Sequence, residues 1–213
     1  MKATRVLIAD DYEIVREGLR ALLAREKGLE VCGEAGTGRE AVERAAGLQP
    51  DVVLMDIVMP ELNGLEATRQ IKRARPETEI LVFTSNETEE TVRNVFKAGA
   101  KAYLLKSETT RHLVPAITAL SAHRTYFSSK VSELIFASYL GEGKFAEAPA
   151  LTGREREIVQ LVAEGKINKE IAVILGVSVK TVEAHRAAIM RKLKLESAAE
   201  LVRYAIRNGI IPA

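Results

Sequence analysis

The chain lacks tryptophan, contains a single cysteine and has few aromatic residues. With an aromatic content of 5%, stacking of side chains on unpaired bases is not an expected binding mode. The lone Cys32 excludes an internal disulfide and favours a reducing compartment. Because Cys32 lies in an apolar stretch, we expect a buried bystander rather than a reactive thiol.

Long apolar runs are missing as well. No stretch approaches the roughly 18 apolar residues that a membrane-spanning helix needs. The first five residues lead directly into a strand-like run, without the apolar core of a signal peptide. The sequence therefore predicts a cytoplasmic protein that does not associate with membranes.

A large net charge is also absent, but the charges are unevenly placed. The net charge is +2, and residues 1–125 carry 18 Lys and Arg against 19 Asp and Glu. Residues 151–213 carry 11 Lys and Arg against 7 Asp and Glu. A neutral front and a basic tail fit a polyanion-binding module at the C-terminal end.

The first part of the chain alternates short apolar runs with helical patterns. The apolar runs cover residues 5–9, 31–35, 52–55, 80–83 and 103–105. Helical patterns follow at 13–25, from 37 onward, and at 65–73, 87–97 and 111–122. This alternation predicts an α/β domain with a doubly wound, five-stranded parallel sheet over residues 1–125.

The rest of the chain is predicted to be helical. Residues 126–140 can form one amphipathic helix, and the Gly- and Pro-containing residues 141–150 suggest a flexible linker. We therefore predict a linker segment at 126–149 and an all-α domain of four helices at 150–213. The expected caps of these helices are Thr152, Asn168, Ser178 and Ser197. Only Gly176-Val177 separates the second helix from the third, which is the signature of a helix-turn-helix.

Polar side chains end four of the apolar runs: Asp10-Asp11, Asp56, Thr84 and Lys106. The carboxyl ends of parallel strands share one edge of the sheet, where ligands collect. Clustered carboxylates repel one another, and a hard cation such as Mg²⁺ would relieve this repulsion. Asp56 could then accept a phosphoryl group, with Lys106 and Thr84 contacting the phosphoryl oxygens. At one position alone, a polar strand end is the simpler explanation, but four successive ones are poorly explained by chance.

The third C-terminal helix has the pattern of a recognition helix. Val182, Ile189 and Leu193 form its inward stripe, so its N-terminal half is predicted to enter the major groove of DNA. The phosphate-facing candidates are Lys169, Lys180, Thr181 and Arg186. Glu183 could accept from a cytosine amino group, and Ala184 or Ala187 could touch a thymine methyl group. The alternative for each Lys or Arg is a solvated surface charge. Few base-reading donors predict binding as a dimer.

These motifs resemble a known family. Asp10-Asp11, Asp56-Ile-Val-Met-Pro60 with Gly64, Thr84 and Lys106 are similar to the receiver domain of two-component response regulators, a flavodoxin-like fold, over residues 4–122. The resemblance implies that a sensor histidine kinase phosphorylates Asp56. It also implies Mg²⁺ held by Asp10, Asp11, Asp56 and the backbone carbonyl of Val58, and a switch role for Tyr103. The alternative for Tyr103 is a surface aromatic with no such role. Many relatives have His where this chain has Tyr12.

The C-terminal segments 151–157, 168–172 and 181–186 resemble the LuxR-type helix-turn-helix, and the match covers residues 150–211. Together the two resemblances indicate the NarL/FixJ class of response regulators. They imply a phosphorylation-controlled transcription factor that binds double-stranded promoter DNA as a homodimer. The last helix, with Leu201, Tyr204 and Ala205, would form the dimer surface by resemblance.

Two other functions remain open on the sequence alone. One is an aspartyl-phosphate enzyme such as a haloacid-dehalogenase-like phosphatase. That chemistry needs an acid/base Asp two residues after the nucleophile, where this chain has Val58, so we do not expect an enzyme. The other is a DNA-binding protein whose receiver dimerises independently of phosphate.

Overall fold

The computed structural model of the protein describes residues 3–140 and 151–211. Contacts divide the chain into two compact units, Met1–Glu142 and Gly143–Ala213, and each is described by itself. The flexible linker predicted at 141–150 lies outside the described residues. Within the described ranges, no helix has both the length and the apolar content needed to cross a membrane.

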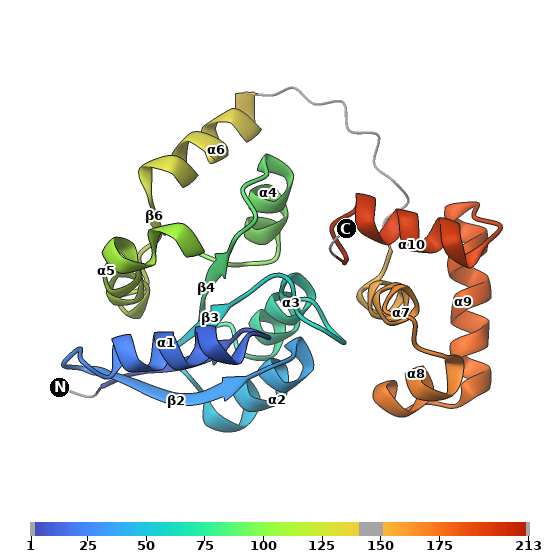
Figure 1. Cartoon of the computed structure of the whole chain (residues 1–213), viewed down its shortest axis with the longest axis horizontal. Coiled ribbons are helices and arrows are strands. Elements are labelled where there is room, and N and C mark those ends of the chain that lie inside the picture. The colour runs from blue at the N-terminus through green and yellow to red at the C-terminus, as the bar shows by residue number, and fades with distance from the viewer. Residues whose placement is uncertain (1–2, 141–150, 212–213) are drawn as a thin grey trace. The chain divides into compact units, whose positions relative to one another are not determined.

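The described part of the first unit contains a six-stranded parallel sheet in the order β2-β1-β3-β4-β5-β6 (Figure 1). Its strands are β1 (Thr4–Ala9), β2 (Leu29–Ala35), β3 (Val52–Met55), β4 (Glu79–Thr84), β5 (Ala102–Leu105) and β6 (Tyr126–Phe127). Because β1 lies between β2 and β3, the strand order reverses there. Ligands bind at such switch points, beyond the carboxyl ends of the strands.

Helices cover both faces of this sheet, as expected for a doubly wound fold. They are α1 (Glu13–Leu23), α2 (Gly38–Leu48), α3 (Gly64–Ala74), α4 (Glu89–Lys97), α5 (Thr109–Ser121) and α6 (Ser129–Leu140), with a 3₁₀ turn at Lys106–Glu108. One core joins the sheet to α2, α3, α4 and α6, and a second joins it to α1 and α5. Adjacent residues such as Val6 and Leu7 are therefore both fully buried, which explains the continuous apolar runs.

The sixth strand corrects the sequence prediction of one helix over 126–140. Tyr126 and Phe127 instead pair with β5, and the helix begins only at Ser129. Phe127 packs edge-on against Phe96 with ring centroids 5.2 Å apart, and the Tyr126 hydroxyl lies 2.7 Å from His112 Nδ1. These tertiary contacts hold both aromatic residues in extended backbone. Val131 of α6 is completely buried in the core beside α4.

The second unit consists of α7 (Gly153–Ala163), α8 (Asn168–Leu175), α9 (Val179–Leu193) and α10 (Ala198–Arg207) in its described residues. Gly176 ends α8 in the left-handed conformation, with φ of +63°. The chain then enters α9, so the predicted helix-turn-helix is confirmed. Val182 and Ile189 are fully buried and Leu193 packs against the same core, as the inward stripe predicted.

The predicted caps hold for three of these four helices. Thr152 and Glu155 form a complete capping box at α7, and Ser178 and Ser197 cap α9 and α10. The prediction that Asn168 caps α8 is wrong, because Asn168 is already its first helical residue. The preceding Ile167 has no side-chain acceptor, and its backbone N–H donates instead to Glu170 at 2.8 Å. The Asn168 side chain instead accepts a hydrogen bond from Arg186 of α9.

Candidate functional sites

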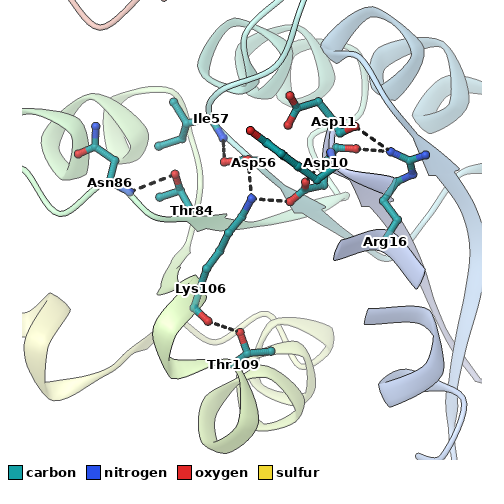
Figure 2. A network of polar contacts seen from close by, with 10 residues as sticks. Asp10, Asp11, Arg16, Asp56, Ile57, Thr84, Asn86, Lys106 and Thr109 are labelled. Carbon is teal, nitrogen blue, oxygen red and sulfur yellow. Dashed lines mark hydrogen bonds and ion pairs between the residues drawn. The ribbon is translucent and has the colours of Figure 1, made fainter. Parts of the chain in front are cut away.

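Three carboxylates meet at the carboxyl edge of the sheet (Figure 2). Asp10 and Asp11 follow β1 and Asp56 follows β3, its neighbour in the sheet. One oxygen from each of the three lies within 4.8 Å of the others. Asp10 and Asp56 are 1% and 5% exposed, whereas Asp11 faces solvent. The parallel topology therefore brings Asp56 beside two residues that lie 45 and 46 positions earlier in the sequence.

Lys106 inserts its ammonium group between two of these carboxylates. Its Nζ lies 2.7 Å from Asp10 Oδ2 and 2.7 Å from Asp56 Oδ2. Lys106 directly follows β5, and its own carbonyl accepts a hydrogen bond from the Thr109 hydroxyl at 2.6 Å. The backbone N–H of Ile57 donates to the other Asp56 oxygen at 2.7 Å. Both oxygens of the Asp56 carboxylate are thus engaged.

The site still carries more negative than positive charge. Burial raises the pKa of Asp56 above its ordinary value of 3.8, outweighing the lowering by the Lys106 hydrogen bond and charge. Partial loss of solvent raises the pKa of Asp11, and the adjacent Asp10 carboxylate raises it further. Burial alone would lower the pKa of Lys106, but hydrogen bonds to Asp10 and Asp56 raise it above 10.5. Hard oxygen donors with excess negative charge suit a hard divalent cation such as Mg²⁺.

The loop after Asp56 is anchored closely to the start of α3. A Cβ atom added at Gly64 would lie 1.7 Å from the Asp56 carbonyl oxygen, so any side chain would displace this backbone. The Gly64 N–H also donates to the Ile57 carbonyl at 2.9 Å. Asn63 caps α3 by accepting from the Glu66 N–H at 2.9 Å. Gly64 is therefore required by the close approach of two backbone segments, and it fixes where Asp56 lies.

Thr84 and Tyr103 contact the same residue of the loop between β4 and α4. Thr84 is buried at the end of β4, and its Oγ1 accepts from the Asn86 N–H at 3.4 Å. The Tyr103 hydroxyl donates to the Asn86 carbonyl at 2.6 Å. Tyr103 is fully buried, so it is not a surface aromatic, and its switch role stays a prediction. Burial raises the pKa of Tyr103, and the Asp56 and Glu87 charges raise it further.

Exposed apolar side chains flank the carboxylates. Tyr12 is 63% exposed and Ile14 is 73% exposed, both just after the acidic pair. Val58, two residues beyond Asp56, is 41% exposed. The Tyr12 N–H donates to Asp10 Oδ1 at 3.0 Å. No acidic side chain stands at position 58, where a phosphatase of the type considered above would need one.

Two residues of this network were not singled out in the sequence. Asn86 donates to Thr84 and accepts from Tyr103, and Arg16 donates to the backbone beside Asp10 and Asp11. The Arg16 side chain contacts backbone carbonyls, and Asn86 makes these contacts with its own backbone. A backbone acceptor carries no residue type, so no motif marks its partner.

The DNA-binding candidates lie around the start and middle of α9. Lys169, Lys180, Glu183, Ala184 and Ala187 are exposed, whereas Thr181 and Arg186 are half-buried. Thr181 Oγ1 lies 2.9 Å from Ser178 Oγ. Arg186 Nη1 donates to Asn168 Oδ1 at 2.5 Å, which ties α9 to the start of α8. His185 of α9 is not part of a candidate metal site. Among the described residues, the group of three side chains that could hold a metal ion is Asp10, Asp11 and Asp56 of the first unit.

Comparison with known proteins identifies both units. Residues 6–118 match the family of response regulator receiver domains, and residues 149–205 match the luxR family of bacterial regulatory proteins. The transcriptional regulatory protein LiaR of Bacillus subtilis is 41% identical over 208 residues, covering 97% of this chain and 99% of LiaR.

Solved structures of RcsB are similar along nearly the whole chain. RcsB of Salmonella enterica serovar Typhimurium, bound to promoter P1flhDC with the phosphomimetic BeF₃⁻, is 28% identical. Its TM-score is 0.61, with 95% of this chain and 98% of that chain covered. A structure of two RcsB dimers bound to two parallel DNAs has 27% identity and a TM-score of 0.61, and covers 97% and 99%.

Proposed function

Because the chain belongs to the two-component response regulators that join a receiver domain to a LuxR-type DNA-binding domain, we propose that phosphorylation of Asp56 controls its binding to promoter DNA. Such a protein is a DNA-binding transcriptional regulator, not an enzyme. A receiver implies a partner histidine kinase as the phosphoryl donor. The proposed place of action is the cytoplasm, where a kinase domain and the DNA are both within reach.

The observation that carries the proposal is the Lys106 ammonium between Asp10 and Asp56, 2.7 Å from each. One Asp56 oxygen forms a bond to phosphorus while the P–N bond of a phosphohistidine breaks. The electron pair of that bond stays on the imidazole nitrogen. Lys106 already lies beside the acceptor, so its charge is available to the phosphoryl oxygens without a large movement.

The acidic cluster is typical of the Mg²⁺ site of receivers. We propose that Asp10, Asp11, Asp56 and the backbone carbonyl of Val58 hold this ion. Their fit rests on the three carboxylate oxygens within 4.8 Å of one another and on the preference of Mg²⁺ for hard oxygen ligands. The bound ion would supply positive charge against the phosphoryl oxygens.

Thr84 and Tyr103 are the proposed switch. The Thr84 hydroxyl would turn from the Asn86 N–H toward the phosphoryl group. Because Asn86 also accepts from the Tyr103 hydroxyl, a shift of this loop changes the surroundings of the buried ring. The β4–α4 loop would in this way report phosphorylation to the outer surface of the receiver.

The output is proposed to be binding of a homodimer to DNA, in keeping with the DNA-bound dimers of RcsB. Lys169, Lys180, Thr181 and Arg186 would contact phosphates, and Glu183, Ala184 and Ala187 would face the bases. The exposure of five of these seven residues supports this assignment. The expectation that Leu201 and Ala205 of α10 form the dimer surface is wrong, because they are 1% and 0% exposed in the core of the second unit. Tyr204 is half-buried and remains the proposed dimer contact of this helix.

An Asp56→Asn variant tests the mechanism. Wild type and variant are treated with acetyl phosphate and Mg²⁺, and intact mass and DNA affinity are measured on a site obtained by in vitro selection. Wild type should gain one phosphoryl group and bind DNA more tightly, and the variant should do neither. Asp51→Asn is the matched control, since it makes the same change just before the same strand β3.

Full donor-dependent DNA binding by Asp56→Asn would show that phosphorylation acts elsewhere or not at all. Equal dimer content with and without the donor, in wild type, would instead favour a receiver that dimerises independently of phosphate. Steady turnover of a phosphate ester would revive the phosphatase alternative.

A further inference from the structure

Arg16 of α1 donates hydrogen bonds to the backbone beside the acidic pair. Its Nη1 lies 2.7 Å from the Asp10 carbonyl oxygen and 3.3 Å from the Asp11 carbonyl oxygen (Figure 2). The side chain is 17% exposed, so it is largely shielded from competing water. At the acidic edge its partners are backbone carbonyls, so it leaves the carboxylate oxygens of Asp10 and Asp11 available for other ligands.

The other side of the guanidinium is held by a neighbouring strand. Arg16 Nε lies 3.3 Å from Glu34 Oε2, and Glu34 belongs to β2. Arg20, one turn further along α1, lies 3.1 Å from the other Glu34 oxygen. Arg16 therefore bridges the β1–α1 loop to the adjacent strand and is not a mobile surface charge.

These contacts fix both peptide groups around Asp11. The Asp10 carbonyl belongs to the peptide group before Asp11, and the Asp11 carbonyl belongs to the one after it. When both are held by one guanidinium, the direction of the Asp11 Cα–Cβ bond is set even though that side chain is exposed. Asp10 is fixed from its other side as well, since its N–H donates to the Ala35 carbonyl at 3.1 Å.

We propose that Arg16 is a positioning residue that holds Asp10 and Asp11 in the arrangement that binds Mg²⁺. This inference rests on the proposed function, because it concerns the affinity of the proposed metal site. Residues that orient metal ligands typically change metal affinity by roughly 10–100-fold when they are replaced. Arg16 would act through the backbone that carries the ligands.

Charge and positioning predict opposite results for this residue. A guanidinium near the site repels a divalent cation, so removing its charge alone would tighten Mg²⁺ binding. Loss of positioning would weaken Mg²⁺ binding despite the removed repulsion. The conservative Arg16→Lys variant keeps the charge, but a single ammonium cannot span two carbonyls and Glu34 as the planar fork does.

The test is titration of Mg²⁺ into the full-length protein by isothermal calorimetry, without phosphodonor. Arg16→Gln and Arg16→Lys should both weaken Mg²⁺ binding by roughly tenfold or more. Arg20→Gln is the matched control, because it removes the same charge from the same helix and the same Glu34 partner. Its Mg²⁺ affinity should stay within about twofold of wild type, the range expected for an exposed charge.

Unchanged Mg²⁺ affinity in Arg16→Lys, or tighter binding in Arg16→Gln, would overturn the inference. Thermal unfolding in EDTA checks that each variant is folded. If either variant is not folded, Glu34→Gln gives the same test, since it leaves Arg16 in place but removes the charged partner that orients it. Weaker Mg²⁺ binding by Glu34→Gln supports the proposal, and unchanged binding refutes it. Failure of wild type to bind Mg²⁺ would instead count against the proposed metal site itself.

Discussion

Replacing Lys106 with methionine should destabilise the receiver most when no divalent cation is bound. The substitution keeps a long side chain but removes the only ammonium group within 2.7 Å of both Asp10 and Asp56 in the described structure. Breaking a buried ion pair on one side typically costs about 3–5 kcal/mol. Because the Lys106 side chain is 20% exposed, we expect about 2–3 kcal/mol, with solvent screening accounting for the reduction.

The loss should depend on pH with a defined sign. The pKa of Asp56 is already raised above 3.8 by burial, so its ionisation in the folded state opposes stability as pH rises through that pKa. Without Lys106 the pKa of Asp56 rises further, so ionisation of Asp56 lowers the stability of the folded state by a larger amount. The difference between wild type and variant should therefore be full near neutral pH and shrink as pH falls toward 3.8, where the unfolded chain is also protonated.

Mg²⁺ should restore part of this loss. An ion present at 100 times its Kd stabilises a protein by about 2.7 kcal/mol. Lys106→Met removes a competing cation from the carboxylates, so it should bind Mg²⁺ more tightly than wild type. Each tenfold gain in affinity closes the stability gap by about 1.4 kcal/mol.

Urea unfolding followed by circular dichroism, in EDTA and in Mg²⁺, measures these effects. Lys101→Met is a suitable control, because Lys101 also pairs with a buried carboxylate, Glu79, at 2.6 Å. Glu79 retains Lys72 and His123 as partners, so the control should lose less stability and its loss should not respond to Mg²⁺. Equal stability of wild type and Lys106→Met in EDTA at neutral pH would refute the reasoning.

Other changes test separate parts of the structure. Gly64→Ala should cost about 1–3 kcal/mol and slow phosphorylation of Asp56, since the new Cβ collides with its carbonyl; an unchanged urea midpoint would contradict this. Tyr103→Phe should lose about 1 kcal/mol and reduce the gain in DNA affinity on phosphorylation at an unchanged phosphorylation rate. Burial alone would raise the pKa of Glu79, but hydrogen bonds from His123 and Lys101 hold it below 4.5. Glu79→Gln should therefore lose stability above pH 4.5, and the loss should fade as the pH of the urea series drops through the folded-state pKa. Lys180→Gln should weaken binding to all DNA sequences alike and reduce the salt dependence of log K by about one unit, and a change confined to one sequence would exclude a phosphate contact.

The parts of the fold that follow from local pattern could be predicted. Five strands were visible because parallel strands buried on both faces need continuous apolar runs. The α9 stripe was visible because Val182 and Ile189 recur at helical spacing and are both fully buried. The acidic cluster could be expected because polar residues follow neighbouring strands, and the order of a doubly wound sheet places those ends together.

Tertiary contacts decided the features that the sequence did not reveal. Residues 126–127 have a pattern that fits the helix after them, and only pairing with β5 and packing on Phe96 make them a strand. Asn168 has the side chain of a typical cap, yet Glu170 satisfies the backbone there and Asn168 binds Arg186 instead. In both places a local preference was overridden by a partner distant in the sequence.

The residues that organise the acidic edge are the hardest to find from sequence, for one physical reason. A carboxylate can be recognised in a sequence by its residue type. Arg16 instead donates to backbone carbonyl oxygens, which every residue has. The Asn86 N–H likewise donates to Thr84, and the Asn86 carbonyl accepts from Tyr103, so another residue at position 86 could make the same two contacts. The two residues differ in how substitution affects them. The Arg16 contacts depend on its side chain, whereas the backbone contacts of Asn86 with Thr84 and Tyr103 survive most replacements and only its side-chain bond from the Thr88 N–H at 2.9 Å is lost. Mutation should therefore reveal the role of Arg16 readily, and should reveal the backbone contacts of Asn86 only through their partners Thr84 and Tyr103.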